Sequence, residues 1–382
     1  VTTGTEIQTF LALGREHGGR DQFGSAVRTS ATTADISNEP IRRCLPWSGN
    51  AVSFGDKEIE LGDFNGDGLQ DIARIQRGAI RYWPGRGNGV WGTQALGDCA
   101  PGKFAADTDV AMADSPLFSD INGSTLRVDD INGDGYDDLV QVRSNAVDIW
   151  LNVNGASWTQ RHIIEGTPPS PAFANHVRLL DINGSGTRDI VWAGAGSFKY
   201  IDLHGGQRPG LLTRVSNGLG KTTDIAYSTS TAEMLAAERL NGTCPSGGWN
   251  SPWCSKMPIV AHVVKRTTES DNLVIGGFGP NVIVTEYEYR DPVYDGEQRE
   301  FRGFKRAREK RIGDANSPTA YTDSQFLLGE CVDETLDDVD DCLLDNPREA
   351  LKGLTVVNEA SSSSGVYLST EATSYRLRRL YR

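Results

Sequence analysis

The stretch DFNGDGLQD, residues 63–71, places three carboxylates and an asparagine amide within one short loop. Like charges held this close repel one another, so the loop needs a cation to compensate them. Calcium takes about six to eight oxygen ligands, and loops of this type supply them at alternate positions. The predicted ligands in this first loop are the side chains of Asp63, Asn65, Asp67 and Asp71 and the carbonyl of Leu69.

The same motif occurs twice more, as DINGDGYDD in residues 130–138 and as DINGSGTRD in residues 181–189. One such motif is weak evidence, because Asp, Asn and Gly clusters also form ordinary metal-free turns. Three copies in one register, each followed by an apolar strand, favour calcium sites. The further predicted ligands are Asp130, Asn132, Asp134 and Asp138 with the Tyr136 carbonyl, and Asp181, Asn183, Ser185 and Asp189 with the Thr187 carbonyl.

Two other kinds of metal site are excluded by the ligand pattern. An EF-hand loop needs a bidentate glutamate at its twelfth position, where these copies carry Arg74, Gln141 and Trp192. A ligand set of oxygens without His or Cys also argues against a dedicated zinc or copper site. Gly66 and Gly68 are expected to adopt positive φ angles, which let the backbone of the first loop curl tightly.

Each loop is followed by a pattern of strand, short turn, strand and glycine-containing turn, with apolar residues alternating in segments such as IRYW and VDIW. Repeats of this length built from short strands are typical of propeller blades. The segment EIQTFLALGREHGGRDQFG resembles the end of the same unit, so the chain is expected to begin inside a repeat. The repeat pattern therefore predicts that residues 1–212 form calcium-binding β-propeller blades, which do not close a ring by themselves.

Residues 213–382 have a different pattern, with long alternating strands such as residues 282–311. Two looser inserts interrupt them, residues 240–258 and residues 330–346. The second insert carries seven carboxylates between Asp333 and Asp345 and no Lys or Arg. A solvated acidic loop explains this insert better than a further cation site does. The whole chain is thus expected to be an all-β protein in two parts.

The cysteines predict disulfides. Six cysteines include two close pairs, which favour Cys244–Cys254 and Cys331–Cys342 and leave Cys44–Cys99. Several connectivities are compatible with six cysteines, and six reduced buried thiols are the alternative. No Cys/His spacing typical of zinc is present.

The overall charge restricts the partners. The 382-residue chain has a formal net charge of -13, so nucleic acid and anionic membranes are poor partners. No stretch approaches the length of a transmembrane helix, so we expect no membrane insertion by this chain. No signal peptide is visible at its start, VTTGTEIQTF. Disulfides and calcium together favour a secreted protein.

The aspartate motif with its following strands resembles the FG-GAP/VCBS-type propeller blades of integrin α heads. Residues 287–306, YEYRDPVYDGEQREFRGFKR, look like the segment after the propeller in the B component of Tc insecticidal toxins and in SpvB-type toxins. Residues 350–381 and the motif DINGSGTRDIVW are also similar to that family. The resemblance covers about residues 55 to 382, while the cysteine-containing inserts and the missing Rhs/YD repeats depart from the family pattern.

The resemblance implies a propeller that docks onto a pore-forming component and gates the exit of cargo. It also implies later strands that begin an Rhs-type shell around a toxic cargo, with Glu300 to Phe304 in its first turns. The expected function is therefore non-enzymatic, and the expected partner is a pore-forming or shell-completing toxin component.

Two alternatives remain open. SpvB-like toxins often carry an ADP-ribosyltransferase, whose Arg, Ser-Thr-Ser and Glu-x-Glu signature is matched in order by Arg214, Ser228–Ser230 and Glu286–Glu288. Both glutamates lie in the predicted shell strand, which disfavours this reading. The second alternative is a calcium-dependent adhesion or carbohydrate-binding propeller that recognises glycans. Its aromatic candidates are Trp83, Trp91, Trp150, Trp158 and Trp192, which in blades more often form packing contacts.

Overall fold

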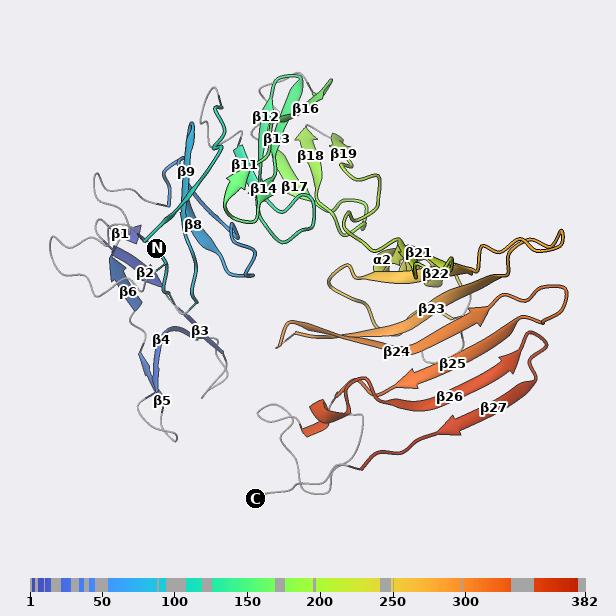
Figure 1. Cartoon of the computed structure of the whole chain (residues 1–382). Coiled ribbons are helices and arrows are strands. Elements are labelled where there is room, and N and C mark those ends of the chain that lie inside the picture. The colour runs from blue at the N-terminus through green and yellow to red at the C-terminus, as the bar shows by residue number, and fades with distance from the viewer. Residues whose placement is uncertain are drawn as a thin grey trace. The chain divides into compact units, whose positions relative to one another are not determined.

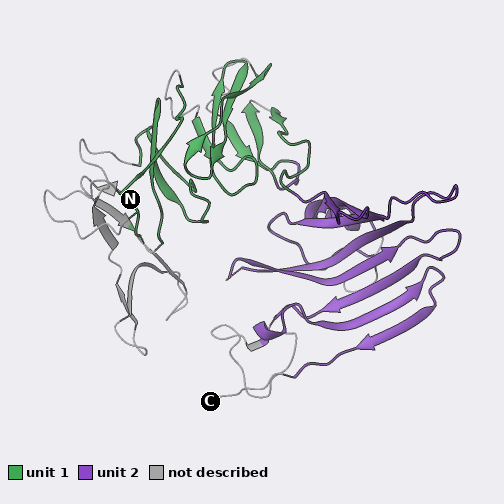
Figure 2. Cartoon of the chain, viewed as in Figure 1, with its two compact units in different colours: residues 1–182, 187–210 green, residues 183–186, 211–382 purple. Residues whose placement is uncertain are grey.

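The computed structural model describes residues 54–87, 89–93, 108–118, 126–168, 176–194, 197–240, 249, 251–296, 298–330 and 347–376, with the backbone of six strands nearer the N-terminus. The chain divides into two compact units, residues 1–182 with 187–210 and residues 183–186 with 211–382 (Figure 2). Nearly all its regular structure is strand, which confirms the all-β prediction. The helices of the described part are α2 (Ser230–Glu238) and the 3-10 helix η1 (Pro347–Leu351), and no described helix is long and apolar enough to span a bilayer.

The first unit contains small antiparallel sheets (Figure 1). The N-terminal strands form the sheets β1-β2-β6 and β3-β4-β5. These strands are β1 (Thr2–Thr3), β2 (Glu6–Thr9), β3 (Leu11–Gly14), β4 (Gln22–Arg28), β5 (Ala34–Ser37) and β6 (Ile41–Cys44).

Three further sheets carry the aspartate loops, and we call them the first, second and third sheets. The first has the order β10-β9-β8-β7, from β7 (Ile59–Gly62), β8 (Asp71–Gln76), β9 (Ala79–Trp83) and β10 (Val110–Met112). The second has the order β11-β12-β13-β16, from β11 (Leu126–Asp129), β12 (Asp138–Arg143), β13 (Ala146–Trp150) and β16 (His162–Glu165), beside the short pair β14 (Asn152–Val153) and β15 (Ser157–Trp158). The third has the order β17-β18-β19, from β17 (Val177–Leu180), β18 (Asp189–Gly194) and β19 (Ser197–Ile201).

The second sheet is buried on both faces. Leu139 and Trp150 pack in one core with Phe64 and other residues of the first sheet. Val140 and its neighbours pack in another core with Val177 and residues of the third sheet. Strands buried on both faces read as nearly continuous apolar runs, and this explains why β12 and β13 are buried along almost their whole length.

The second unit is one eight-stranded antiparallel sheet whose strands follow one another in chain order, β20 to β27 (Figure 1). Its two longest strands lie within residues 282–311, where the alternating pattern predicts long strands, and they are adjacent in the sheet. The strands are β20 (Arg214–Ser216), β21 (Thr222–Thr229), β22 (His262–Ser270), β23 (Val282–Asp295), β24 (Glu300–Arg311), β25 (Ala320–Phe326), β26 (Thr355–Ser362) and β27 (Tyr367–Ala372).

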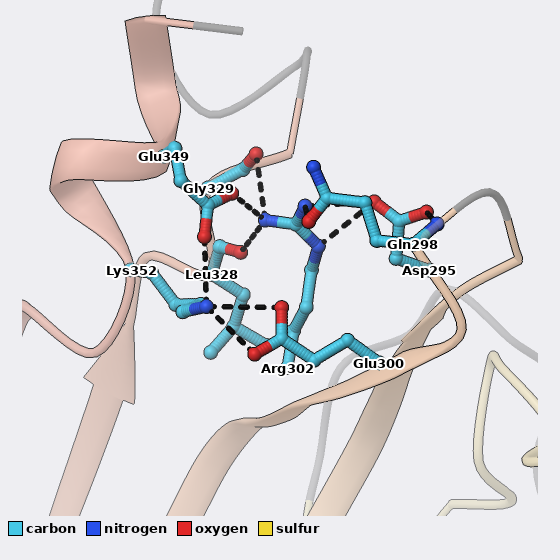
Figure 3. A network of polar contacts seen from close by, with 8 residues as sticks. All are labelled: Asp295, Gln298, Glu300, Arg302, Leu328, Gly329, Glu349 and Lys352. Carbon is cyan, nitrogen blue, oxygen red and sulfur yellow. Dashed lines mark hydrogen bonds and ion pairs between the residues drawn. The ribbon is translucent and has the colours of Figure 1, made fainter. Parts of the chain in front are cut away.

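A buried arginine fastens one end of this sheet (Figure 3). The side chain of Arg302 is 3% exposed, and its Nε and Nη2 donate to Asp295 at 3.1 and 2.7 Å. Its Nη1 donates to Glu349 and to the carbonyl of Leu328, at 2.5 and 3.2 Å. Leu328 and Glu349 lie on either side of the acidic insert, so one guanidinium ties together the segments that enter and leave it. The insert itself, residues 331–346, lies outside the described residues.

The cysteine predictions are tested at one position. Cys254 is disulfide-bonded, and its partner lies outside the described residues. The pairing Cys244–Cys254 therefore stays a prediction. Cys99, Cys331 and Cys342 also lie outside the described residues, and only the backbone of Cys44 is described.

Candidate functional site

The three aspartate loops occupy the same place in their sheets. Residues 63–71 link β7 to β8, residues 130–138 link β11 to β12, and residues 181–189 link β17 to β18. We call them the first, second and third loops. Strands flank all three, which confirms the prediction that they are not EF-hands. Gly66 and Gly68 have φ angles of 75° and 81°, as the tight curl of the first loop requires.

The first aspartate of the loop is the centre of its hydrogen bonding. One carboxylate oxygen of Asp63 accepts from the backbone N–H of Gly66 at 2.7 Å and of Asp67 at 3.2 Å. The other oxygen accepts from the N–H of Gly68 at 2.7 Å. Asp130 accepts the three corresponding bonds in the second loop, so the two loops have the same local geometry.

The third and fifth positions continue this pattern. The side-chain oxygen of Asn65 accepts from the N–H of Asp67 at 3.0 Å, and Asp67 accepts from the N–H of Leu69 at 2.8 Å. Asn132, Asp134 and Tyr136 repeat both bonds in the second loop. In the third loop, the N–H of Ser185 donates to Asn183 at 2.9 Å. The predicted ligand side chains therefore hold the loops in their conformation by accepting hydrogen bonds from backbone N–H groups.

The ninth position differs, because its carboxylate is buried. Asp71 is 0% exposed, and its two oxygens accept from the N–H groups of Phe64 and Gly85 at 2.9 and 2.6 Å. Asp138 is buried in the same way and accepts from Ile131 and Asn152 at 3.2 and 2.8 Å. This carboxylate thus joins the start of the loop to the chain that leaves the next strand of its sheet.

Burial raises the pKa values of these two carboxyl groups. Loss of solvation raises the pKa of Asp71 to about 6, although two backbone N–H groups oppose the shift. The same cause raises the pKa of Asp138 to about 8. A cation beside these groups would favour their charged forms, because opposite charges close by lower the pKa of a carboxyl group.

The donor set of the loops has the chemistry that calcium requires, since every predicted ligand is an oxygen. A carboxylate oxygen has about two lone pairs, so one that accepts an amide can still bind an ion. Within the described ranges, no group of three His, Cys, Asp or Glu side chains converges to hold a metal ion. Calcium binding therefore stays a prediction.

Neighbouring loops are bonded to each other through residues that the motif pattern does not predict. The carboxylate of Asp137 accepts from the N–H of Asp63 at 2.7 Å, and the N–H of Asp137 donates back to the Asp63 carbonyl at 2.7 Å. Asn152 donates its side-chain amide to the carbonyls of Phe64 and Asp137 at 2.9 and 3.2 Å. Its side-chain oxygen accepts from the N–H of Gly155 at 2.9 Å. Both residues bridge the first and second loops.

The second and third sheets are joined at the corresponding positions by different residues. Arg188, which occupies the position of Asp137 in the third loop, donates to Asp129 at 3.1 Å. The ring Nε2 of His204 lies 2.8 Å from the carbonyl of Ile131, which corresponds to the bond from Asn152 to the Phe64 carbonyl at 2.9 Å. Arg208 donates to the carbonyl of Gly133 at 2.7 Å. The loops therefore lie where one sheet meets the next.

The third loop also takes part in the second unit, to which residues 183–186 belong. There the ring Nε2 of His262, at the start of β22, lies 2.8 Å from the carbonyl of Ser185. A Cβ added to Gly184 would meet the side chain of Thr231 at 2.6 Å. This loop is therefore packed closely against its neighbours.

Most residues named for the two alternative functions make structural contacts. Trp83, Trp150, Trp158 and Trp192 are 2–6% exposed and lie in apolar cores, where no sugar could stack on them. Arg214 pairs with Asp224 across β20 and β21. Glu286 pairs with Lys310 and Glu288 lies opposite Arg308 in the sheet. The oxygen of Ser230 accepts from the N–H of Ala261.

Comparisons with known proteins support one family resemblance. Residues 152–332 match the family described as the insecticide toxin TcdB middle/N-terminal region. No curated protein matches the chain.

Solved toxin structures have a similar fold. TcdB2-TccC3 without its hypervariable C-terminal region aligns over 84% of this chain with a TM-score of 0.62 and 19% identity. A Photorhabdus luminescens Tc holotoxin pore carrying a TccC3 mutation aligns over 95% of this chain with a TM-score of 0.64 and 19% identity. The chain covers 16% and 17% of these two chains, so it corresponds to a small part of each. At this identity the likeness establishes the fold alone.

Proposed function

We propose that this chain is a non-enzymatic part of a Tc-type toxin complex, in which it helps to dock, gate or enclose a toxic cargo. The observation that carries the proposal is the family match over residues 152–332, which spans the third aspartate loop and the whole of strands β20 to β25. The likeness to Tc toxin structures extends over both units, which supports a common architecture. The setting is extracellular, as for a secreted toxin.

The first unit serves as the docking or gating module and consists of FG-GAP/VCBS-type propeller blades. Two features support this. The three sheets pack through two shared cores in chain order, as successive blades do. The loops lie at the junctions, where Asp137 and Asn152 bond neighbouring loops together. A module that bears load at a docking surface needs such connections, because each small sheet alone buries too little apolar area.

The second unit serves as the beginning of an Rhs-type shell wall. An eight-stranded antiparallel sheet with strands in chain order supports this role, since such a sheet extends by adding strands at its edge. Charged residues form pairs across its strands, such as Arg308 with Asp323 at 2.6 Å. These pairs leave the sheet polar on at least one face, as suits a wall exposed to solvent or to unfolded cargo.

Calcium is proposed to bind the aspartate loops. Asp63, Asn65 and Asp67 would hold the ion in the first loop with Asp71 and the Leu69 carbonyl, and the two other loops would use the equivalent residues. The bound ion would supply positive charge that offsets the repulsion among these carboxylates. The chain's own contribution is the fixed loop geometry, which the backbone N–H bonds to Asp63 and Asp130 set in advance.

Assembly with a pore-forming Tc component tests the proposal. The purified chain is mixed with that component, with calcium or with EGTA, and the mixture is followed by analytical ultracentrifugation. We expect a complex whose amount falls when calcium is removed. A glycan array run in parallel tests the adhesion alternative, and NAD turnover tests the transferase. Glycan binding or NAD turnover without any assembly would contradict the proposed role.

A further inference from the structure

Among the described strands, the third sheet has no counterpart of the fourth strand that completes the first and second sheets. In the first sheet β10 pairs with β9, and in the second sheet β16 pairs with β13. The third sheet ends at β19, and no described strand pairs with the outer edge of β19 (Figure 1). Such an edge presents backbone N–H and C=O groups to which a strand of another chain can pair.

The side chains beside this open edge are two exposed aromatic rings. Phe198 and Tyr200 are 62% and 49% exposed. The strand registers place them at the positions of two residues that are buried in each of the other sheets. These residues are Ile80 and Tyr82 in the first sheet and Val147 and Ile149 in the second. The third sheet therefore leaves exposed a row of apolar side chains that its relatives in the same chain cover.

The fourth strands of the two other sheets show which kind of strand fits such an edge. Both run antiparallel to the third strand of their sheet. In the first sheet Met112 lies opposite Ile80. In the second sheet Ile164 lies opposite Val147. Apolar pairs across strands stabilise the pairing. A strand that fits β19 is therefore antiparallel and carries an apolar residue opposite Phe198.

A pair of opposite charges accompanies the fourth strand in both of these sheets. Arg81, the central residue of β9, pairs at 3.2 Å with Asp109, which directly precedes β10. Asp148, the central residue of β13, lies 3.9 Å from Arg161, which directly precedes β16. The equivalent residue of β19 is Lys199, which is exposed and has no ion pair within the described ranges. An acidic residue directly before a fourth strand would supply its partner.

We propose that the open edge of β19 binds an antiparallel strand of another protein, with an acidic residue beside Lys199 and an apolar residue opposite Phe198. Main-chain hydrogen bonds supply the affinity in strand addition, and alternate side chains supply the selectivity. A second copy of this chain fits poorly. Lys199 is the central residue of β19, so antiparallel pairing of two β19 strands about their centres would bring two lysines together, and like charges across strands destabilise the pairing.

The inference deepens the docking role proposed for the first unit, because it assigns a surface and a ligand chemistry to that role. Its test uses synthetic peptides and no toxin component. Failure of the chain to assemble with a pore-forming component would leave a positive peptide result standing. Failure of the peptides to bind would leave assembly through another surface intact, so the two proposals are tested separately.

Hydrogen exchange with mass spectrometry tests strand binding on the intact chain. The probe is an end-blocked peptide with the sequence of residues 108–113, TDVAMA, whose register in the first sheet places its aspartate beside Lys199 and its methionine opposite Phe198. A Kd of about 0.2 mM would slow the exchange of residues 197–201 about tenfold at about 2 mM peptide, because protection scales with 1 + [peptide]/Kd. The peptide TDVPMA should give no protection, since proline removes a backbone donor. The exchange of β16 should not change, because β16 already completes its sheet.

Exchanging the charges tests the assigned partner of Lys199. The peptide TKVAMA, which has lysine in place of the aspartate, should bind the unmodified chain roughly two- to fivefold more weakly than TDVAMA. The variant Lys199→Glu should reverse this preference. Phe198→Ser should weaken the binding of both peptides. Both substituted residues are exposed, and unchanged exchange of β17 and β18 without peptide would verify that the variants are folded.

Three results would overturn the proposal. The first is exchange of residues 197–201 that TDVAMA changes by less than about twofold at the same peptide concentration. The second is a preference between the two charged peptides that Lys199→Glu leaves unchanged. The third concerns a second copy of the chain and is measured by sedimentation without peptide. A dimer that Phe198→Ser dissociates would show that the edge of β19 pairs with another β19.

Discussion

Substitution of Asn152 should separate the first two sheets of unit 1 and leave the second unit intact. The side chain of Asn152 is buried, with the residue 3% exposed, and makes three hydrogen bonds, to Phe64, Asp137 and Gly155. Each such bond contributes about 0.5–1.5 kcal/mol, and the buried partners left behind lose solvation as well. Asn152→Ala should therefore lower the free energy of unfolding of the first unit by about 2–4 kcal/mol.

The isosteric variant tests the reasoning further. Asn152→Asp keeps the acceptor for the Gly155 N–H but removes both donated bonds and places a carboxylate beside the Phe64 and Asp137 carbonyls. It should destabilise more than alanine does, because the buried carboxylate keeps only the Gly155 N–H as a donor and faces two carbonyl oxygens. Gln160→Ala serves as the control, since Gln160 is exposed and lies between β15 and β16.

Urea unfolding followed by hydrogen exchange reports the two units separately. The peptides from residues 59–83 and 126–158 should lose protection at lower urea in the Asn152 variants, while those from β23 and β24 should not change. Equal stability of Asn152→Asp and the unmodified chain would show that the bonds to Phe64 and Asp137 contribute nothing to the junction.

Three further predictions concern pH, calcium and the buried arginine. Burial raises the pKa of Asp138 to about 8 from its ordinary value of 3.8. Without calcium, the protonated Asp138 side chain should therefore stabilise the first unit fully below pH 4, and this stabilisation should be lost as pH rises towards 8. Asp138→Asn should make the melting temperature of the first unit depend less on pH in this range. The third loop has a serine where the others have a middle aspartate, so EDTA should loosen the hairpins after Asp71 and Asp138 before that after Asp189, as measured by hydrogen exchange. Arg302→Met should destabilise the second unit by about 1.5–3 kcal/mol in urea, because it removes the bonds of a buried guanidinium to Asp295, to Glu349 and to the Leu328 carbonyl.

The sequence was sufficient to predict the elements of the candidate site. Three motifs in one register placed the loops between strands, and their glycines predicted the positive φ angles. The period of two in residues 282–311 predicted long strands in the second unit. These features are local, because each depends on residues that are close together in the chain.

The contacts between neighbouring loops could not be predicted in the same way. The eighth loop position is Gln70, Asp137 and Arg188 in the three copies, so the residue that bridges to the preceding sheet does not repeat. Asn152 and His204 make equivalent bonds to backbone carbonyls, yet they share no side-chain type and differ in spacing from their loops. A backbone carbonyl accepts a hydrogen bond from any suitable donor, so different residue types can form the junction and the sequence shows no repeated residue there.

The ninth position illustrates a different limit. Its aspartate was predicted as a ligand because it completes the alternating pattern, and the structure assigns Asp71 and Asp138 two backbone amides each. The two roles are compatible in a loop that binds calcium, since one lone pair of an oxygen can face an amide and another an ion. They differ in their consequence without the ion, because burial then raises the pKa of Asp71 and Asp138. A bound calcium ion would oppose this shift, so the pH dependence of Asp138 and the EDTA response of its hairpin should change together.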